Sequence, residues 1–183
     1  MGVLFSKGEP YDKPAAVGSK HFEKFVETLP SLTGKVVVIT GTTTGTGYVT
    51  ALTCAKRGAS VVLLNRPSER ATSSEAELRK FVPDATFTSV SCDLTSFASV
   101  RAAASELNAT FASSGVDVLC NNAGVMALAE NATVDGYDVQ MQTNHLSHFL
   151  LLKEIFPLLE KAAATHGEAR VVHHTSLARY GKA

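Results

Sequence analysis

The sequence predicts an α/β protein built on a doubly wound parallel sheet. Residues 35–40, KVVVIT, and 60–65, SVVLLN, are continuous apolar runs rich in β-branched residues. Such runs are too apolar to face water on either side, which is typical of central parallel strands. Helical stretches alternate with the runs, and strict alternation requires crossovers that cover both faces of one sheet. We therefore expect three layers, with helices on each side of the sheet.

The first 33 residues predict an arm that precedes the folded domain. Pro10, Pro14 and Pro30 interrupt this polar stretch and prevent a long helix. Apolar residues at helical spacing within 21–29 predict one short helix. We place the domain boundary after residue 33, so that residues 34–183 form the domain.

Within the domain, each expected element follows from its own pattern. After the strand at 35–40, a glycine-containing turn leads into a helix over about 46–57, and Gly58 ends that helix before the strand at 60–65. The remaining expected elements are strands at 86–94, 116–124 and 170–176 and helices at 96–113 and 139–166.

Composition limits the classes of function. Lys+Arg and Asp+Glu both number 17, and apolar residues make up 45% of the chain, so the composition is globular and nucleic-acid binding is not expected. No run reaches the roughly 18 apolar residues of a membrane span. The first thirty residues also lack the regions of a secretory signal, so we expect a cytoplasmic protein.

The cysteines and histidines predict no metal site. Cys54, Cys92 and Cys120 lie far apart in apolar contexts, without the paired spacing of a disulfide framework or a metal knuckle. We expect small core residues in a reduced compartment. His145 and His148 lie three residues apart, but no carboxylate or thiol completes a ligand set with them.

The amino terminus, MGVLFSK, matches the acceptor pattern for N-myristoylation at Gly2. The alternative is an unmodified start, because glycine after methionine is common. A single acyl chain binds membranes only marginally, so the expected contact is peripheral and reversible.

The turn after the first strand, TGTTTGTG, is the first candidate binding site along the chain. Its glycines let the backbone turn sharply and approach a ligand, and the free N–H groups of the following helix favour a pyrophosphate. Such a turn also joins strands to helices without a ligand, but the strand–turn–helix context of a dinucleotide site is present. The expected cofactor-binding residues of the turn are Gly41, Thr42, Thr44, Gly45, Thr46 and Gly47.

The end of the second strand indicates which dinucleotide is bound. A site for NAD places a carboxylate there to hold the ribose 2′-hydroxyl, whereas this chain has Asn65 followed by Arg66. A guanidinium suits a 2′-phosphate, and the missing acid removes a repulsion. The alternative is a solvated surface arginine. We expect NADP, or NADPH in its reduced form, as the cofactor.

Five segments together resemble one family: TGTTTGTG, CDLTS, NNAG, TNHLSHF and the strand that ends at Ser176. Their order and spacing are those of a short-chain dehydrogenase/reductase. The amino-acid sequence over residues 33–180 is most similar to the branch of retinol dehydrogenases and protochlorophyllide reductases. The resemblance implies a Rossmann fold and NADP-dependent hydride transfer between nicotinamide and a carbonyl or alcohol.

The resemblance also implies roles for residues beside the turn. Asp93 and Leu94 match the pair that borders the adenine, although they also suit a strand exit and a helix N-cap. The NNAG motif ends the fourth strand next to the cofactor ribose in the family, and its asparagines also stabilise a turn. The matching residues are Asn121, Asn122, Ala123 and Gly124.

Two residues match the catalytic machinery of the family. Asn144 matches the asparagine that supports the proton relay, and an asparagine on an otherwise apolar helical face is costly unless it is hydrogen-bonded. Ser176 matches the serine that hydrogen-bonds the substrate oxygen. Thr46 stands where the family usually has isoleucine or leucine, a replacement that we do not expect to abolish binding.

The family completes its relay with a tyrosine and a lysine spaced Y-x-x-x-K on one helix face. This chain offers Tyr180 and Lys182, which are two residues apart and too close to Ser176 to match. We therefore expect the chain to be truncated before that helix, with a sheet incomplete at the carboxyl terminus and no activity of its own.

Two functions follow from this pattern. The first is an NADP-dependent oxidoreductase acting on a small, apolar carbonyl or alcohol, with a homo-oligomer expected for a full-length form. The second is a non-catalytic NADP(H)-binding protein. Asn144 and Ser176 favour the first, because a binding protein has no need for them.

Overall fold

The computed structural model of this chain describes residues 21–129 and 131–176. These residues belong to two units, which divide between Pro30 and Ser31. The first unit contains one described helix, α1 (Phe22–Thr28), within the stretch expected to be helical. The second unit contains the sheet and all other described elements.

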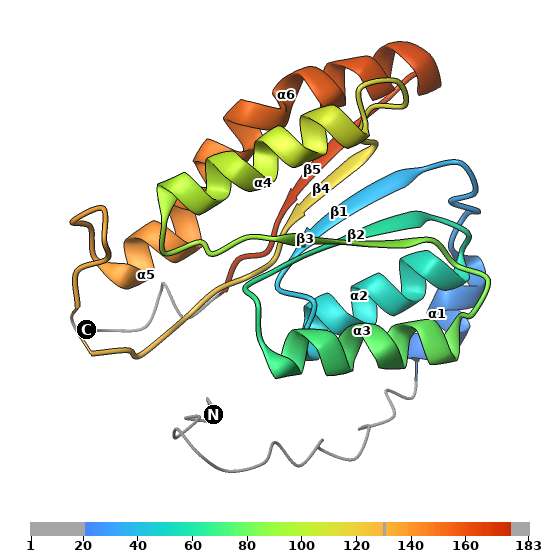
Figure 1. The fold of residues 1–183 in the computed structure, drawn as a ribbon. Coiled ribbons are helices and arrows are strands. Elements are labelled where there is room, and N and C mark those ends of the chain that lie inside the picture. The colour runs from blue at the N-terminus through green and yellow to red at the C-terminus, as the bar shows by residue number, and fades with distance from the viewer. Residues whose placement is uncertain (1–20, 130, 177–183) are drawn as a thin grey trace. The chain divides into compact units, whose positions relative to one another are not determined.

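The sheet has five strands in the order β3-β2-β1-β4-β5, and every adjacent pair is parallel (Figure 1). Its strands are β1 (Val36–Thr40), β2 (Ser60–Asn65), β3 (Phe87–Ser91), β4 (Val118–Asn121) and β5 (Arg170–His173). The chain first builds outward from β1 to β3 and then returns to the other side of β1 for β4 and β5. This is a doubly wound α/β fold, as the sequence predicts.

Helices cover both faces of the sheet, with α2 and α3 on one face and α4 and α6 on the other (Figure 1). These helices are α2 (Gly45–Lys56), α3 (Glu69–Phe81), α4 (Phe97–Thr110) and α6 (Ser147–His166). Alternate residues of β1 therefore enter different cores. Val37 and Ile39 belong to the core under α2 and α3, whereas Val36 and Val38 belong to the core under α4 and α6.

Helix α3 is absent from the elements that the sequence predicts. Its sequence, ERATSSEAELRKF, is mostly polar, and only Ser74 and Leu78 are buried, so few apolar residues mark its buried face. The capping signals do mark it. Ser68 is the N-cap and accepts a hydrogen bond from Ala71 N at 3.2 Å, and two basic residues lie in the last turn of the helix.

The segment expected as one helix over 139–166 is helical throughout, but it is not a uniform α-helix. A short helix, α5 (Val139–Met141), is followed by a five-residue π-turn, η1 (Gln142–Leu146), and only then by α6. Gln142 at the start of the π-turn is fully buried, and its Nε2 donates to Asp135 Oδ2 at 2.6 Å. This bond to the preceding loop, which the helical pattern does not indicate, accompanies the wider turn.

The fifth strand lies at the edge of the sheet. Val171 is 36% exposed and Val172 is 46% exposed, unlike the buried valines of β1 and β2. The strands expected at 86–94, 116–124 and 170–176 all end earlier than predicted. The last residues of these expected strands leave the sheet and form loops at the carboxyl ends of the strands.

Among the described residues, no helix combines the length and the apolar character that crossing a bilayer requires. The predicted acylation site at Gly2 lies outside the described residues.

Candidate functional site

The glycine turn and the NNAG segment leave the sheet side by side. β1 and β4 are neighbours, with Val38 opposite Leu119 and Ile39 opposite Cys120, although many residues separate the two strands in sequence. After β3 the chain crosses to the other side of β1, so the order of the strands reverses between β1 and β4. In open parallel sheets, ligands bind in the crevice outside the carboxyl ends of two such strands.

Two glycines of the turn allow close contact with the NNAG loop. Gly41 has φ +72°, and a Cβ added there would lie 2.9 Å from Cα and Cβ of Ala123. A Cβ on Gly47 would lie 2.2 Å from the carbonyl oxygen of Gly41 and 2.4 Å from Asn122 Nδ2. The two loops therefore interlock through positions that only glycine fits.

The third glycine faces open space. Gly45 has φ +60°, and an added Cβ would meet nothing within 4 Å. It begins α2, and the N-cap residue Thr44 makes no capping hydrogen bond with its side chain among the described residues. Gly45 and Thr46 are exposed. The positive end of α2 thus opens toward solvent at the crevice, which suits an anion such as a pyrophosphate.

Asn65 holds the turn from its protein side. Its Oδ1 accepts from Thr42 N at 2.8 Å, and its Nδ2 donates to Thr42 Oγ1 at 2.7 Å. Thr42 is fully buried, so its side chain supports the turn rather than facing the crevice. Arg66 follows directly and is exposed. The sequence indicates that Asn65 is not an acid, but not that its amide holds the turn.

Thr40, the last residue of β1, connects the turn to the NNAG loop. Its Oγ1 accepts from Asn122 N and from Ala123 N, both at 3.0 Å, and the residue is 1% exposed. Asn122 Nδ2 donates in return to Thr40 O at 2.9 Å and to Gly41 O at 3.1 Å. Sequence reasoning assigned no role to Thr40, although a hydroxyl at the end of an apolar strand is a signal for such a contact.

The NNAG loop is also tied to the end of β5. Asn122 Oδ1 lies 3.0 Å from His174 Nδ1, and Asn121 Nδ2 lies 3.3 Å from His173 Nδ1. Asn121 is buried, and its Oδ1 is without a hydrogen-bond partner among the described residues. Asn121 therefore lies inside the scaffold of the loop, whereas Gly124 is exposed at the crevice.

Asn144 lies in the π-turn η1 and contacts the segment after NNAG. Its Oδ1 accepts from Val125 N and its Nδ2 donates to Val125 O, both at 2.8 Å. The side chain is exposed, so the expected argument from burial cost is wrong for this residue. The paired backbone contact instead holds the loop that leaves the crevice, and π-turns are frequent at functional sites.

Ser176 lies three residues beyond β5 and is exposed. Because β5 is parallel to β4, its carboxyl end reaches the same edge of the sheet as the NNAG loop. Tyr180 and Lys182 lie outside the described residues.

Asp93 and Leu94 have structural contacts at the exit of β3. Asp93 Oδ1 accepts from Thr95 N at 2.9 Å and from Thr95 Oγ1 at 2.7 Å, which closes a tight turn. The N-cap of α4 is Ser96 rather than Asp93. Leu94 is buried, and its carbonyl accepts from Ser147 Oγ at 2.6 Å. The adenine contact of this pair stays a prediction.

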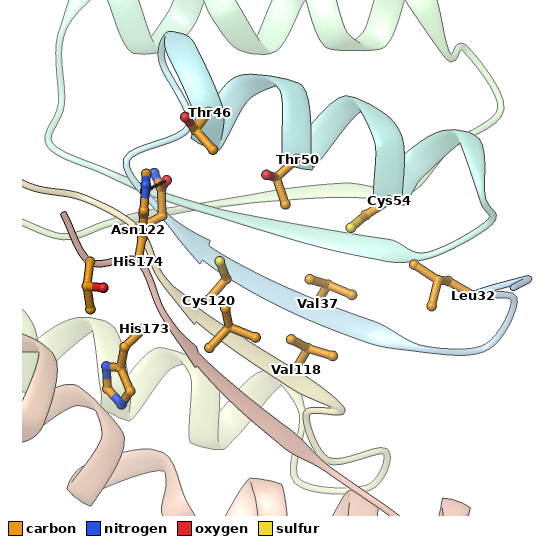
Figure 2. A pocket seen from close by; sticks show the side chains of 12 residues that line it. Leu32, Val37, Thr46, Thr50, Cys54, Val118, Cys120, Asn122, His173 and His174 are labelled. Carbon is orange, nitrogen blue, oxygen red and sulfur yellow. Dashed lines mark hydrogen bonds between the residues drawn. The ribbon is translucent and has the colours of Figure 1, made fainter. Parts of the chain in front are cut away.

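A cavity of about 400 Å³ lies between α2 and the end of β5 (Figure 2). Thr46, Asn122 and His174 line its polar end, beside the glycine turn, and Val37 and Val118 line its apolar part further along the strands. The cavity therefore joins the dinucleotide turn to the exposed side of β4 and β5.

Two of the three cysteines pack against the core under α2 and α3 and also line this cavity. Cys54 and Cys120 are partly buried, whereas Cys92 is buried. Burial, and secondly the proximity of Cys120, raises the pKa of Cys54 to about 11. Burial, and secondly Asp93, raises the pKa of Cys92 to about 12. The thiols of Cys54 and Cys92 are therefore neutral at pH 7 and poor nucleophiles.

A parallel sheet with a glycine turn and an open helix N-terminus at its switch point is the arrangement of Rossmann-type dinucleotide-binding proteins. Residues 35–181 match the model of the short chain dehydrogenase family. The chain belongs to the short-chain dehydrogenase/reductase family, and its curated relatives include retinol dehydrogenases.

Two relatives illustrate the match. The chain is 38% identical over 152 residues to an uncharacterized oxidoreductase of Schizosaccharomyces pombe, covering 82% of this chain and 44% of the relative. It is 34% identical over 148 residues to human retinol dehydrogenase 13, covering 81% of this chain and 43% of the relative. The chain thus spans less than half the length of these relatives.

A solved structure shows the same fold. The Pseudomonas aeruginosa RhlG/NADP active-site complex superposes with a TM-score of 0.64 and 31% sequence identity. The superposition covers 77% of this chain and 54% of that structure.

Proposed function

We propose that this chain forms the NADP-binding half of an oxidoreductase that interconverts a carbonyl and an alcohol. One observation carries the proposal: the open N-terminus of α2 faces the switch point of the sheet, beside glycines that keep the backbone clear of side chains. The family match and the similarity to the RhlG/NADP complex support it.

The residues present fit the dinucleotide. Backbone N–H groups at Gly45 and Thr46 would hold the pyrophosphate at the positive end of α2. Arg66 would pair with the 2′-phosphate, and Gly124 would let the nicotinamide ribose approach the NNAG loop closely. The bound cofactor would supply or accept the hydride. Ser176 would hydrogen-bond the substrate oxygen.

A non-catalytic NADP(H)-binding protein is the second candidate. The residues that lie four positions after Tyr11, Tyr48 and Tyr137 are alanine, leucine and methionine, so none of these tyrosines has the lysine of the family motif. In addition, Asn144 uses its whole amide group on the backbone of Val125, a contact that a binding protein would also need. The two candidates differ in whether a proton donor completes the site.

We expect the chain to bind NADPH more tightly than NADH. Arg66→Glu should weaken NADPH by about 1–3 kcal/mol, because a charged hydrogen bond to the 2′-phosphate is lost. NADH affinity should change little. Arg70→Glu is the matched control, since Arg70 is an exposed arginine in the first turn of α3, and it should leave the preference intact. Calorimetry measures both affinities. Equal affinity of the unchanged protein for both cofactors would contradict the role of Arg66.

We also expect that the 183-residue chain by itself binds NADPH without reducing a carbonyl. Tyr180 and Lys182 are two residues apart and cannot share a helix face, so no lysine supports a tyrosine as proton donor. In the presence of apolar aldehydes and ketones, the absorbance of NADPH should fall no faster with the protein than without it. Turnover that is lost in Tyr180→Phe would instead establish Tyr180 as an unusual proton donor.

A further inference from the structure

His148 is a buried histidine that contacts two parts of the site. It lies near the start of α6 and is 2% exposed. Its Nε2 lies 2.9 Å from Thr40 Oγ1, and its Nδ1 lies 3.2 Å from the carbonyl oxygen of Asn144. The ring therefore connects the end of β1 to the π-turn that carries Asn144.

Counting protons assigns the direction of these bonds. Thr40 Oγ1 already accepts from Asn122 N and Ala123 N, which occupies both lone pairs of the hydroxyl. Its single proton must then be donated to His148 Nε2. A carbonyl oxygen only accepts, so Nδ1 carries the ring proton and donates it to Asn144 O. The network is complete only with a neutral imidazole in the Nδ1–H form.

A second ring proton would break the network. An imidazolium donates from Nε2 as well, so Thr40 Oγ1 would face three donors with two lone pairs. Either the ring or one of the two NNAG amides would lose its partner. The nearby titratable groups, His173 on β5 and His145 on η1, add repulsion when they are charged. Burial, followed by these two histidines, lowers the pKa of His148 despite its bond to Asn144 O.

We propose that His148 is a positioning residue for the cofactor, which holds the NNAG loop against the glycine turn through Thr40 only while its ring is neutral. This inference rests on the proposed function, because it assigns the loop to dinucleotide binding. The contribution of His148 to NADPH affinity is then constant above the ordinary histidine pKa of about 6.5, and it is lost as the pH drops through the lower pKa of His148.

Two variants separate the ring's charge from its hydrogen bond. His148→Gln places an amide oxygen where Nε2 accepts from Thr40, and the amide does not titrate in this range. His148→Leu removes the acceptor. We expect His148→Gln to keep NADPH affinity at pH 7.5 within about threefold of the unchanged protein, and His148→Leu to lose about tenfold. Circular dichroism verifies that each variant is folded.

The pH profile carries the decisive comparison. The 2′-phosphate of NADPH itself titrates near pH 6, so affinity declines somewhat in every variant. The unchanged protein should decline more steeply than His148→Gln. His145→Gln is the comparison variant, because His145 is an exposed histidine of the same segment. It should keep the steep decline of the unchanged protein, with the midpoint at a slightly higher pH because one neighbouring charge is removed. Identical profiles for the unchanged protein and His148→Gln would overturn the proposal.

A measurement without cofactor keeps the inference separate from the proposed function. Imidazole ¹⁵N shifts should show the Nδ1–H form of His148 at neutral pH. On acidification, the amide protons of Asn122 and Ala123 should shift with the midpoint of His148. An Nε2–H form, or amides that do not follow this midpoint, would reject the network. Failure of the chain to bind NADPH at any pH, with these signals present, would reject the proposed function alone.

Discussion

Gly47→Ala should abolish measurable NADPH binding at micromolar protein. The added methyl group would lie 2.2 Å from the carbonyl oxygen of Gly41 and 2.4 Å from Asn122 Nδ2, neither of which is a flexible side-chain end free to move. Asn122 is held by bonds to Thr40 and His174, so the strain must displace the turn. A displacement of about 1 Å misaligns the amides that hold a pyrophosphate and costs on the order of a hundredfold.

Gly34→Ala is the control for this variant. Gly34 has φ +79° and no atom within 4 Å of an added Cβ. It lies before the amino end of β1, whereas the turn follows the carboxyl end of this strand. It should cost about 1 kcal/mol of stability through backbone strain and leave NADPH affinity unchanged. Calorimetric titration compares the two variants. If Gly47→Ala bound NADPH as tightly as Gly34→Ala, the interlocked turn would not be the binding element.

Asp117→Ala should lower the free energy of unfolding by about 3–5 kcal/mol. Asp117 precedes β4, and its side chain is 5% exposed. Its carboxylate accepts from Val36 N at 2.8 Å, from Lys35 Nζ at 3.1 Å and from His166 Nδ1 at 2.6 Å. One side chain thus joins the starts of β1 and β4 to the end of α6. Its removal leaves the buried N–H of Val36 without this acceptor and removes the partner of the partly exposed Lys35 and His166 side chains.

The control for Asp117→Ala is Glu168→Ala. Glu168 is likewise an acid in an ion pair, with Arg170 at 2.9 Å, but the two side chains are 63% and 68% exposed. Water screens such a pair, so the loss should not exceed about 0.5–1 kcal/mol. Urea unfolding followed by circular dichroism measures both variants. A similar loss in the two would show that burial of Asp117 contributes nothing.

The loss of folding stability at low pH should depend on the same carboxylate, Asp117. Burial by itself would raise the pKa of Asp117, but the hydrogen bonds from Val36, Lys35 and His166 outweigh burial and lower it. A lowered folded-state pKa means that the stabilisation is present above the unfolded value of about 3.9 and is lost as the pH falls through the folded value. Asp117→Asn should flatten this acid-induced loss. An unchanged acid profile in that variant would exclude Asp117 as its source.

Local patterns determined which residues form most of the elements. The strands at β1 and β2 were predictable because fully apolar β-branched runs have no stable place except the inside of a sheet. The glycine turn was predictable because its spacing answers a local requirement of the backbone. Helix α3 and the π-turn were missed, because α3 contains few apolar residues and the π-turn depends on the contact between Gln142 and Asp135 in the preceding loop.

The sequence by itself determined the α/β alternation, the family and the residues of the dinucleotide turn. Only the tertiary structure decided which polar groups meet, because such contacts join residues far apart in sequence. Thr40 meets Asn122 across 82 residues and His148 across 108 residues. The sequence alone does not distinguish a core position from a hydrogen-bond network for a histidine at position 148. The order β3-β2-β1-β4-β5 places the end of β1 beside β4, and burial then requires every polar group there to find a partner.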